Sequence, residues 1–133
     1  MLLIHIQLEI KISLTFLSPP VPSQPPPNIV VKSTSTSTID VTWKPINQAY
    51  VNGILVGCEV RYAKDDGSSR PSTVTLDAGT NDVVLRDLEY FTRYKVVVCA
   101  RTSKGCGKEY SDIAYTFGDG EKNVALFQTN EFS

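Results

Sequence analysis

Short stretches of alternating apolar and polar residues recur along this chain, and the clearest of them lies near its middle. After Leu88 and a turn, the side chains of Tyr94, Val96 and Val98 fall on one face of an extended segment. The residues between them, such as Lys95, fall on the other face. This period of two predicts a half-buried strand at residues 92–103.

The same pattern predicts six further strands, separated by turn-forming residues such as Asn52-Gly53 and Asp66-Gly67. Val, Ile, Thr and Tyr dominate the middle of the chain, and clusters of Gly, Pro, Asn and Asp interrupt it at short intervals. The prediction is an all-β protein, a seven-stranded antiparallel immunoglobulin-like β-sandwich. The expected strands are residues 28–33, 38–43, 54–64, 72–76, 82–86, 92–103 and 108–117.

The beginning of the chain divides into an apolar segment and a proline-rich one. Residues 4–16 alternate like a strand, but Glu9 and Lys11 interrupt the apolar run that a signal peptide or a membrane helix needs. We interpret them as the end of a preceding module or an imperfect gene start. The prolines within residues 19–27 have no amide donor, so we expect this segment to be a linker rather than part of a sheet. Binding to an SH3-type domain is less favoured, because no Arg flanks the prolines. The expected divisions are a leading segment and linker at 1–24, one domain at 25–118 and a tail at 119–133.

Composition and charge argue against catalysis and against nucleic acid as a partner. The 133 residues carry a formal net charge of −1, and the single histidine, His5, lies outside the expected domain. No phosphate-binding Gly-rich loop, metal-binding spacing or nucleophile–base pair is found in the sequence. The acidic residues fall at turns and strand ends. We therefore expect no enzyme activity, no cofactor, no metal and no small-molecule substrate.

The order of landmarks distinguishes two families of sandwich. Trp43 precedes every cysteine, whereas an immunoglobulin domain needs the order Cys, Trp, Cys. The chain instead resembles the fibronectin type III family over residues 25–117. Departures from that pattern are Cys58, Tyr90, Cys99 and Cys106. The resemblance is carried by a Pro-rich start, Trp43 and Pro45, Asn52-Gly53, Val60 and Tyr62, the block 88–100, and Thr102, Gly105, Gly107, Tyr110 and Ser111.

This resemblance implies which residues form the core and which tyrosine closes one end of it. Tyr94 looks like the tyrosine-corner residue, whose hydroxyl bonds to the backbone of the turn at 87–91. Leu88 is expected to close the bottom of the core, and the Trp43 side chain is expected to be one of the largest in it. The expected core residues are Trp43, Val60, Tyr62, Leu88, Tyr94, Val96 and Val98.

Cys99 and Cys106 form a candidate disulfide. Closing this eight-residue loop would stabilise the fold by about 2.5 kcal/mol. Against the bridge, a regular hairpin would pair Cys99 with a residue near Glu109 or Tyr110, so that Cys106 would have to fold back. Both alternatives, bridged and free, stay open. Cys58 is expected to face the core as a free thiol.

A basic outer face is the candidate interaction surface. It could bind an acidic protein surface or a sulfated polysaccharide, although rows of exposed charge often only keep a sheet soluble. The candidate residues are Arg61, Arg93, Lys95, Arg101, Lys104 and Lys108.

The sequence therefore favours a non-catalytic protein-interaction module, a fragment of a cell-surface adhesion or receptor-type protein. The expected contact is the loop at 102–108 or the basic face, with a protein partner or neighbouring domains. The alternative is a structural spacer without a ligand of its own, and an appendage of an enzyme comes third. By the resemblance, the expected location is extracellular or cell-surface, with the membrane reached only through a parent protein.

Overall fold

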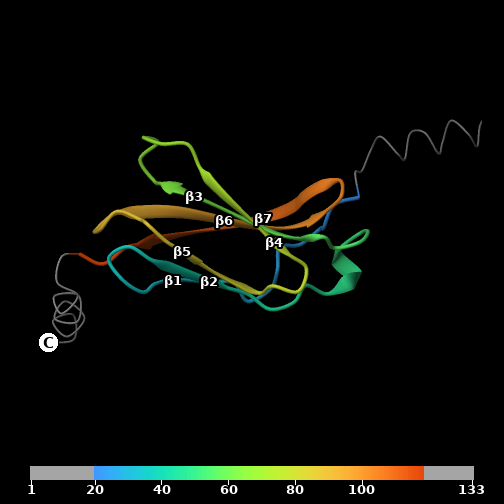
Figure 1. The fold of residues 1–133 in the computed structure, drawn as a ribbon. Helices are drawn as coiled ribbons and strands as arrows, with labels where there is room; N and C mark the ends of the chain where they lie inside the picture. The colour runs from blue at the N-terminus through green and yellow to red at the C-terminus, as the bar shows by residue number, and fades with distance from the viewer. Residues whose placement is uncertain (1–19, 119–133) are drawn as a thin grey trace, which may run out of the picture.

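The computed structural model describes residues 20–118, which form two β-sheets packed face to face (Figure 1). The predicted seven-stranded antiparallel sandwich is confirmed. The alternating residues 4–16 and the tail at 119–133 lie outside the described residues. The strands are β1 (Val30–Ser33), β2 (Ile39–Thr42), β3 (Gly57–Lys64), β4 (Ser72–Asp77), β5 (Asp82–Leu85), β6 (Arg93–Thr102) and β7 (Gly105–Tyr115).

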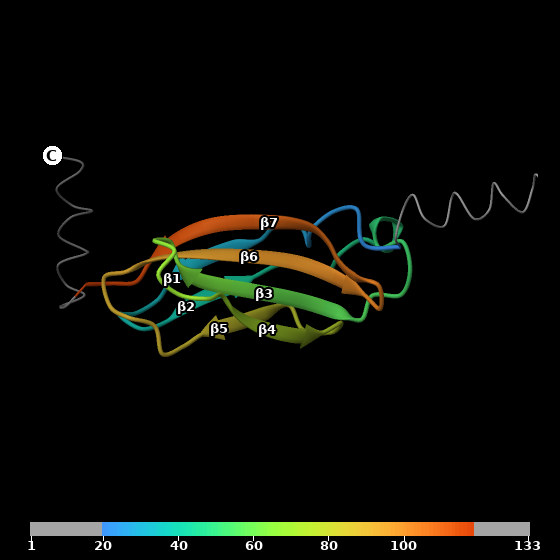
Figure 2. The ribbon, with the colours of Figure 1, turned by 90° about the horizontal axis from the view of Figure 1, so that it is seen from above.

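The strands are divided between a three-stranded sheet, in the order β1-β2-β5, and a four-stranded sheet, in the order β4-β3-β6-β7. Figure 2 shows the four-stranded sheet from above, with β6 between β3 and β7. Val60 on β3 lies opposite Val98 on β6, which in turn lies opposite Tyr110 on β7. These residues face the core, and because successive side chains alternate, the same register sets which side chains share the outer face.

The core forms where the inward faces of the two sheets meet. Val41 and Ile39 come from one sheet, and Val60, Val96 and Val98 from the other, and all five are fully buried. Tyr62 is only half-buried and packs at the margin of the cluster, because only one of its strand neighbours is apolar: it lies opposite Val96 on β6 but opposite Ser72 on the edge strand β4. The remaining expected core residues, Trp43, Leu88 and Tyr94, are buried.

A small hydrogen-bond network closes one end of the core around Tyr94. The backbone N–H of Glu89 donates to the Tyr94 hydroxyl oxygen at 2.9 Å. The buried Thr116 hydroxyl donates to the Glu89 carbonyl at 2.6 Å and accepts from the Thr92 N–H at 2.9 Å. The turn is therefore held from both sides, and the role of Thr116 was not predicted from the sequence.

Two strands begin three residues away from the predicted position, and one short helix was not predicted. Strand β3 begins at Gly57 rather than at residue 54, and β7 begins at Gly105 rather than at residue 108. A short 3-10 helix, η1 (Gln48–Tyr50), precedes β3, and the Asn47 side chain caps it by accepting from the Ala49 N–H at 2.9 Å. Among residues 20–118, no helix is long and apolar enough to span a membrane.

Residues 20–24, called here the N-terminal strap, lie against the sandwich rather than leading away from it. Pro22 is buried, and its carbonyl accepts from the Lys108 N–H at 3.1 Å. The Pro20 carbonyl accepts from the Thr102 hydroxyl at 2.6 Å. Proline lacks a donor but keeps its acceptor, so a proline-rich segment can pair with one side of a strand edge.

Candidate functional site

The β6–β7 hairpin carries the two cysteines, and a bulge in it brings them together. Cys99 lies opposite Glu109, as expected for a regular hairpin, but Arg101 lies opposite Cys106. Two steps along β6 thus match three along β7, so β7 contains one extra residue. The Cα atoms of Cys99 and Cys106 are 5.7 Å apart, and their sulfur atoms are joined in a disulfide.

Gly107 lies in this bulge and meets the N-terminal strap. A Cβ atom at this position would lie 1.9 Å from the Pro22 carbonyl oxygen, which no side chain can tolerate. The backbone of the strap can therefore approach β7 only because residue 107 is glycine. The bulge, the disulfide and the strap form one connected unit.

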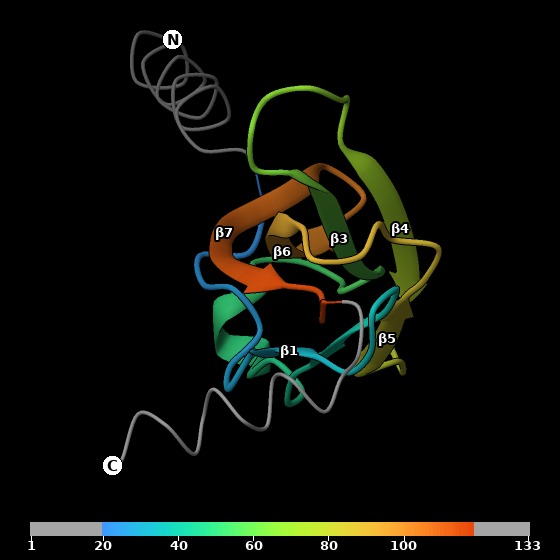
Figure 3. The same cartoon turned by 90° about the vertical axis from the view of Figure 1, so that its left-hand side faces the viewer.

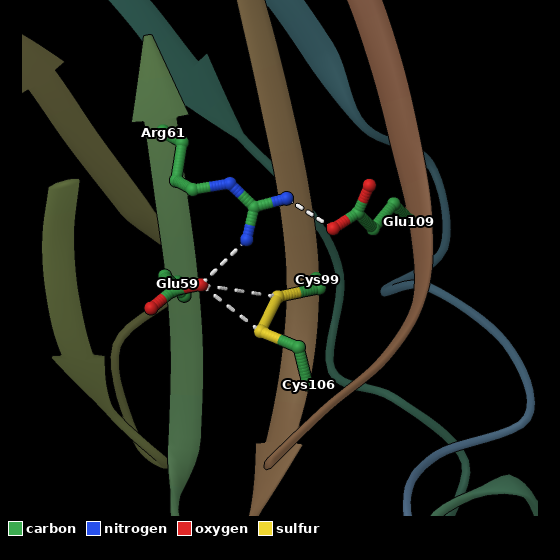
Figure 4. The surroundings of a disulfide bond; sticks show 5 residues. All are labelled: Glu59, Arg61, Cys99, Cys106 and Glu109. Carbon is green, nitrogen blue, oxygen red and sulfur yellow. Dashed lines mark hydrogen bonds and ion pairs between the residues drawn. A yellow bond between two sulfur atoms is a disulfide. The ribbon is translucent and has the colours of Figure 1, made fainter. Parts of the chain in front are cut away.

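Charged side chains surround the disulfide on the outer face of the four-stranded sheet (Figure 4). The Glu59 Oε2 atom lies 3.1 Å from the Cys106 sulfur and 3.8 Å from the Cys99 sulfur. Arg61 donates to the same Glu59 oxygen at 2.8 Å and also pairs with Glu109. Its hydrogen bond to Glu109 raises the pKa of the Arg61 guanidinium above its ordinary value, against the opposing effect of burial.

The predicted basic face is thus partly neutralised. Arg61 is held by two carboxylates, and Arg93 pairs with Asp65 at 2.9 Å while its guanidinium lies 5.9 Å from the Tyr115 ring centroid. Lys95 lies on the same outer face, beside Val97. Within residues 20–118, no ion pair is found for the other four candidates, Lys95, Arg101, Lys104 and Lys108.

Cys58 faces the opposite side of the sheet and is chemically separate from the bridge. It lies free and buried in the core, and burial raises its pKa to about 11. A thiol is inert when it is buried and protonated. This cysteine therefore contributes packing rather than reactivity.

The hairpin end presents a mixed apolar and cationic surface. The Val56 N–H donates to the Arg101 carbonyl at 2.9 Å, and the Lys104 N–H donates to the Thr102 hydroxyl at 3.2 Å. Ile54, which is 81% exposed, and Val56, which is 45% exposed, project from the segment that leads into β3. The Asn52 side chain donates to the Val21 carbonyl at 2.9 Å, which ties this segment to the N-terminal strap. We call Ile54, Val56, Arg101, Lys104 and Lys108 the hairpin-end surface.

The loop between β3 and β4 rises away from the four-stranded sheet in Figure 3. Between this loop and the outer face lies an open groove of about 330 Å³, whose lining includes Arg61, Lys95, Val97 and Pro71. Its lining contains no nucleophile paired with a base. The sulfur atoms of Cys99 and Cys106 with the Glu59 carboxylate are the only group of metal-ligating atoms found among residues 20–118.

Three parts of this site were not predicted from the sequence. Glu109 was not singled out, although the expected pairing of Cys99 near position 109 already placed it beside the outer-face charges. The N-terminal strap was interpreted only as a linker. The sequence predicts Ile54 as the first residue of a strand, whereas the strand begins at Gly57. The Asn52-Gly53 turn just before it is the signal that could have predicted an exposed Ile54.

Comparison with known proteins gives matches over this same region. Mouse sidekick-2 is 33% identical over 94 residues, covering 69% of this chain and 4% of that protein. Mouse contactin-3 is 37% identical over 87 residues, covering 65% and 8%. The rat cell adhesion molecule DSCAM is 31% identical over 99 residues, covering 71% and 5%. The chain therefore spans less than a tenth of the length of these relatives.

Solved structures show the same fold. The third fibronectin III domain of the human KIAA0343 protein has a TM-score of 0.68 at 22% identity, covering 78% of this chain and 90% of that one. The fn3 domain of human contactin 1 has a TM-score of 0.65 at 26% identity, covering 74% and 82%. The family model of the fibronectin type III domain matches residues 24–117. With its seven strands in two antiparallel sheets, the chain belongs to the fibronectin type III family.

Proposed function

We propose that this domain is a non-catalytic protein-interaction module of a larger cell-surface adhesion or receptor-type protein. Similarity to DSCAM, described as a cell adhesion molecule, and to a receptor-type tyrosine phosphatase of mouse supports this class. The latter is 34% identical over 94 residues, which make up 5% of its length. The domain's own contribution is then binding.

The observation that carries the proposal is the hairpin-end surface. Ile54 and Val56 place apolar side chains in solvent, and the Val56 N–H bonds to the carbonyl of Arg101, three residues before Lys104. Apolar residues flanked by cations are typical of the centre and rim of a protein interface. The Val56 N–H bonds to the Arg101 carbonyl of the disulfide-closed hairpin, and the Asn52 side chain bonds to the N-terminal strap, so little conformational entropy would be lost on binding.

The partner that fits this surface is a protein with an apolar centre and an acidic rim. Arg101, Lys104 and Lys108 supply positive charge without a carboxylate partner among residues 20–118. The face around Arg61 is a weaker candidate, because Glu59 and Glu109 already neutralise it. Electrostatic complementarity would speed association and select the partner.

A structural spacer is the second candidate. The described chain begins at one end of the sandwich and leaves at the opposite end, as the blue and red ends in Figure 1 show. This arrangement suits a module that is joined in series with others. A spacer needs no exposed apolar surface, so the two candidates differ in what mutation of Ile54 does.

Cell binding by a tetramerised domain, measured by flow cytometry, tests the proposal. Binding should be lost when the cells are treated with trypsin and should fall strongly for Ile54→Asp and for Lys104→Glu. Matched controls are Val84→Asp and Lys32→Glu, on exposed positions of the three-stranded sheet. Binding that survives both test substitutions, or no binding to any cell type, would favour the spacer.

A further inference from the structure

The side chains around the disulfide suggest chemistry that binding through the hairpin end does not use. Glu59 directs one carboxylate oxygen, Oε2, at both sulfur atoms, and no hydrogen links them, because disulfide sulfurs carry no proton (Figure 4). The three ligand atoms lie within 4.8 Å of one another. Cysteine sulfur and carboxylate oxygen are both ligands of zinc in proteins.

We propose that reduction of the Cys99–Cys106 disulfide converts this cluster into a site for Zn²⁺, bound by the two thiolates and the Glu59 carboxylate. The bridge and the metal site are then mutually exclusive states of the same atoms. This proposal does not depend on the proposed function, because the hairpin-end surface and the sulfur cluster involve different side chains.

The distances fit tetrahedral coordination. With Zn–S near 2.3 Å and Zn–O near 2.1 Å, the sulfur–oxygen edge of a tetrahedron is about 3.6 Å. The observed separations between Glu59 Oε2 and the sulfurs, 3.1 and 3.8 Å, bracket that value. The sulfurs themselves must separate to about 3.8 Å. With Cα atoms 5.7 Å apart, rotation of the two side chains can achieve this without moving the strands.

The charges of the neighbours suit the proposed site. Two thiolates and one carboxylate around a divalent cation leave one negative charge, and Arg61 already lies against Glu59 to offset it. Arg61 also keeps its contact with Glu109, which lies opposite Cys99. Thiolate ligands select zinc over calcium and magnesium, which prefer oxygen. A water molecule would fill the fourth position.

The conversion balances in two steps. Two molecules of a low-molecular-weight thiol deliver two electrons to the disulfide. They leave as one oxidised disulfide, while Cys99 and Cys106 become free thiols. Zinc then displaces the two thiol protons, so that one metal ion is bound and two protons are released. Exchange with the oxidised low-molecular-weight disulfide reverses the reduction: it accepts the two electrons, the bridge closes and the metal is released.

Co²⁺ binding to the reduced protein tests the proposal, followed by displacement with Zn²⁺. The full chain is reduced with a phosphine, and the phosphine is then removed under anaerobic conditions. Co²⁺ is added stepwise while the thiolate-to-cobalt charge-transfer absorption is recorded. We expect one Co²⁺ per chain, displaced by Zn²⁺, and none bound by the oxidised protein. Fluorescence of the single tryptophan, Trp43, which is buried, reports whether the reduced chain is folded.

Three variants decide the ligands. Glu59→Gln should weaken Co²⁺ binding about tenfold or more, because it removes an anionic ligand. Glu89→Gln, which makes the same charge change away from the cluster, and Cys58→Ala should bind as the unmutated protein does. The proposal is overturned if the reduced protein gives no charge-transfer band, or if Glu59→Gln does not weaken Co²⁺ binding. It is also overturned if the oxidised protein binds Co²⁺ equally well, or if the reduced chain is unfolded when Co²⁺ is bound.

Discussion

The Glu89 backbone N–H donates a hydrogen bond to the Tyr94 hydroxyl oxygen, at 2.9 Å, and so ties the turn before β6 to that strand. Tyr94→Phe should lower the free energy of unfolding by about 1 kcal/mol, because it leaves the Glu89 N–H without this acceptor. Urea denaturation measures the change. Tyr90→Phe, at a residue that is 64% exposed, is the matched control and should have little effect. Equal effects of the two substitutions would show that the corner does not stabilise the domain.

Adjacent residues on β5 allow a sharp test of which sheet face is the core. Leu85 is fully buried, whereas its neighbour Val84 points to the outer face of the three-stranded sheet. Leu85→Ala should cost about 2–5 kcal/mol of stability, because it leaves a cavity in the core. Val84→Ala should cost much less, since little apolar area returns to water. Chemical denaturation of both variants checks this, and a larger loss for Val84→Ala would mean that the facing of β5 is wrong.

Gly107 is predicted to be the position where the N-terminal strap and the bulge depend on each other. Gly107→Ala places a methyl group against the Pro22 carbonyl and should destabilise the domain by about 1–3 kcal/mol through displacement of the strap. Gly79→Ala, whose Cβ would meet only an Asp77 side-chain oxygen at 3.8 Å, is the control. Thermal unfolding compares the two. A Gly107→Ala protein as stable as the control would show that the strap does not pack on β7.

Much of the framework could be predicted because it depends on local alternation. The inward positions of β6, Tyr94, Val96 and Val98, follow from the period of two alone, and so does the inward facing of Cys58. Tyr62 shows where this reasoning stops. Its facing was correct, but its burial depends on what lies opposite it on β4, which alternation within one strand does not contain.

The site was harder to predict because it depends on contacts between distant segments. Arg61 and Glu109 are 48 residues apart and meet across β6 only when both pairings of that strand are known. The β7 bulge is a similar case. It is compatible with glycines in the hairpin, but it is fixed by Pro22, which the sequence places in a linker. The basic residues of the outer face could therefore be predicted from the sequence, but the carboxylates that neutralise them could not.

The number of titratable thiols in the unreduced, denatured protein is the most direct test of the central claim, that a disulfide fastens the β6–β7 hairpin. Both the rigid hairpin-end surface and the proposed conversion of the disulfide into a metal site start from the pairing of Cys99 with Cys106. We predict one thiol per chain, that of Cys58, rising to three after reduction. Three thiols before reduction would contradict the claim.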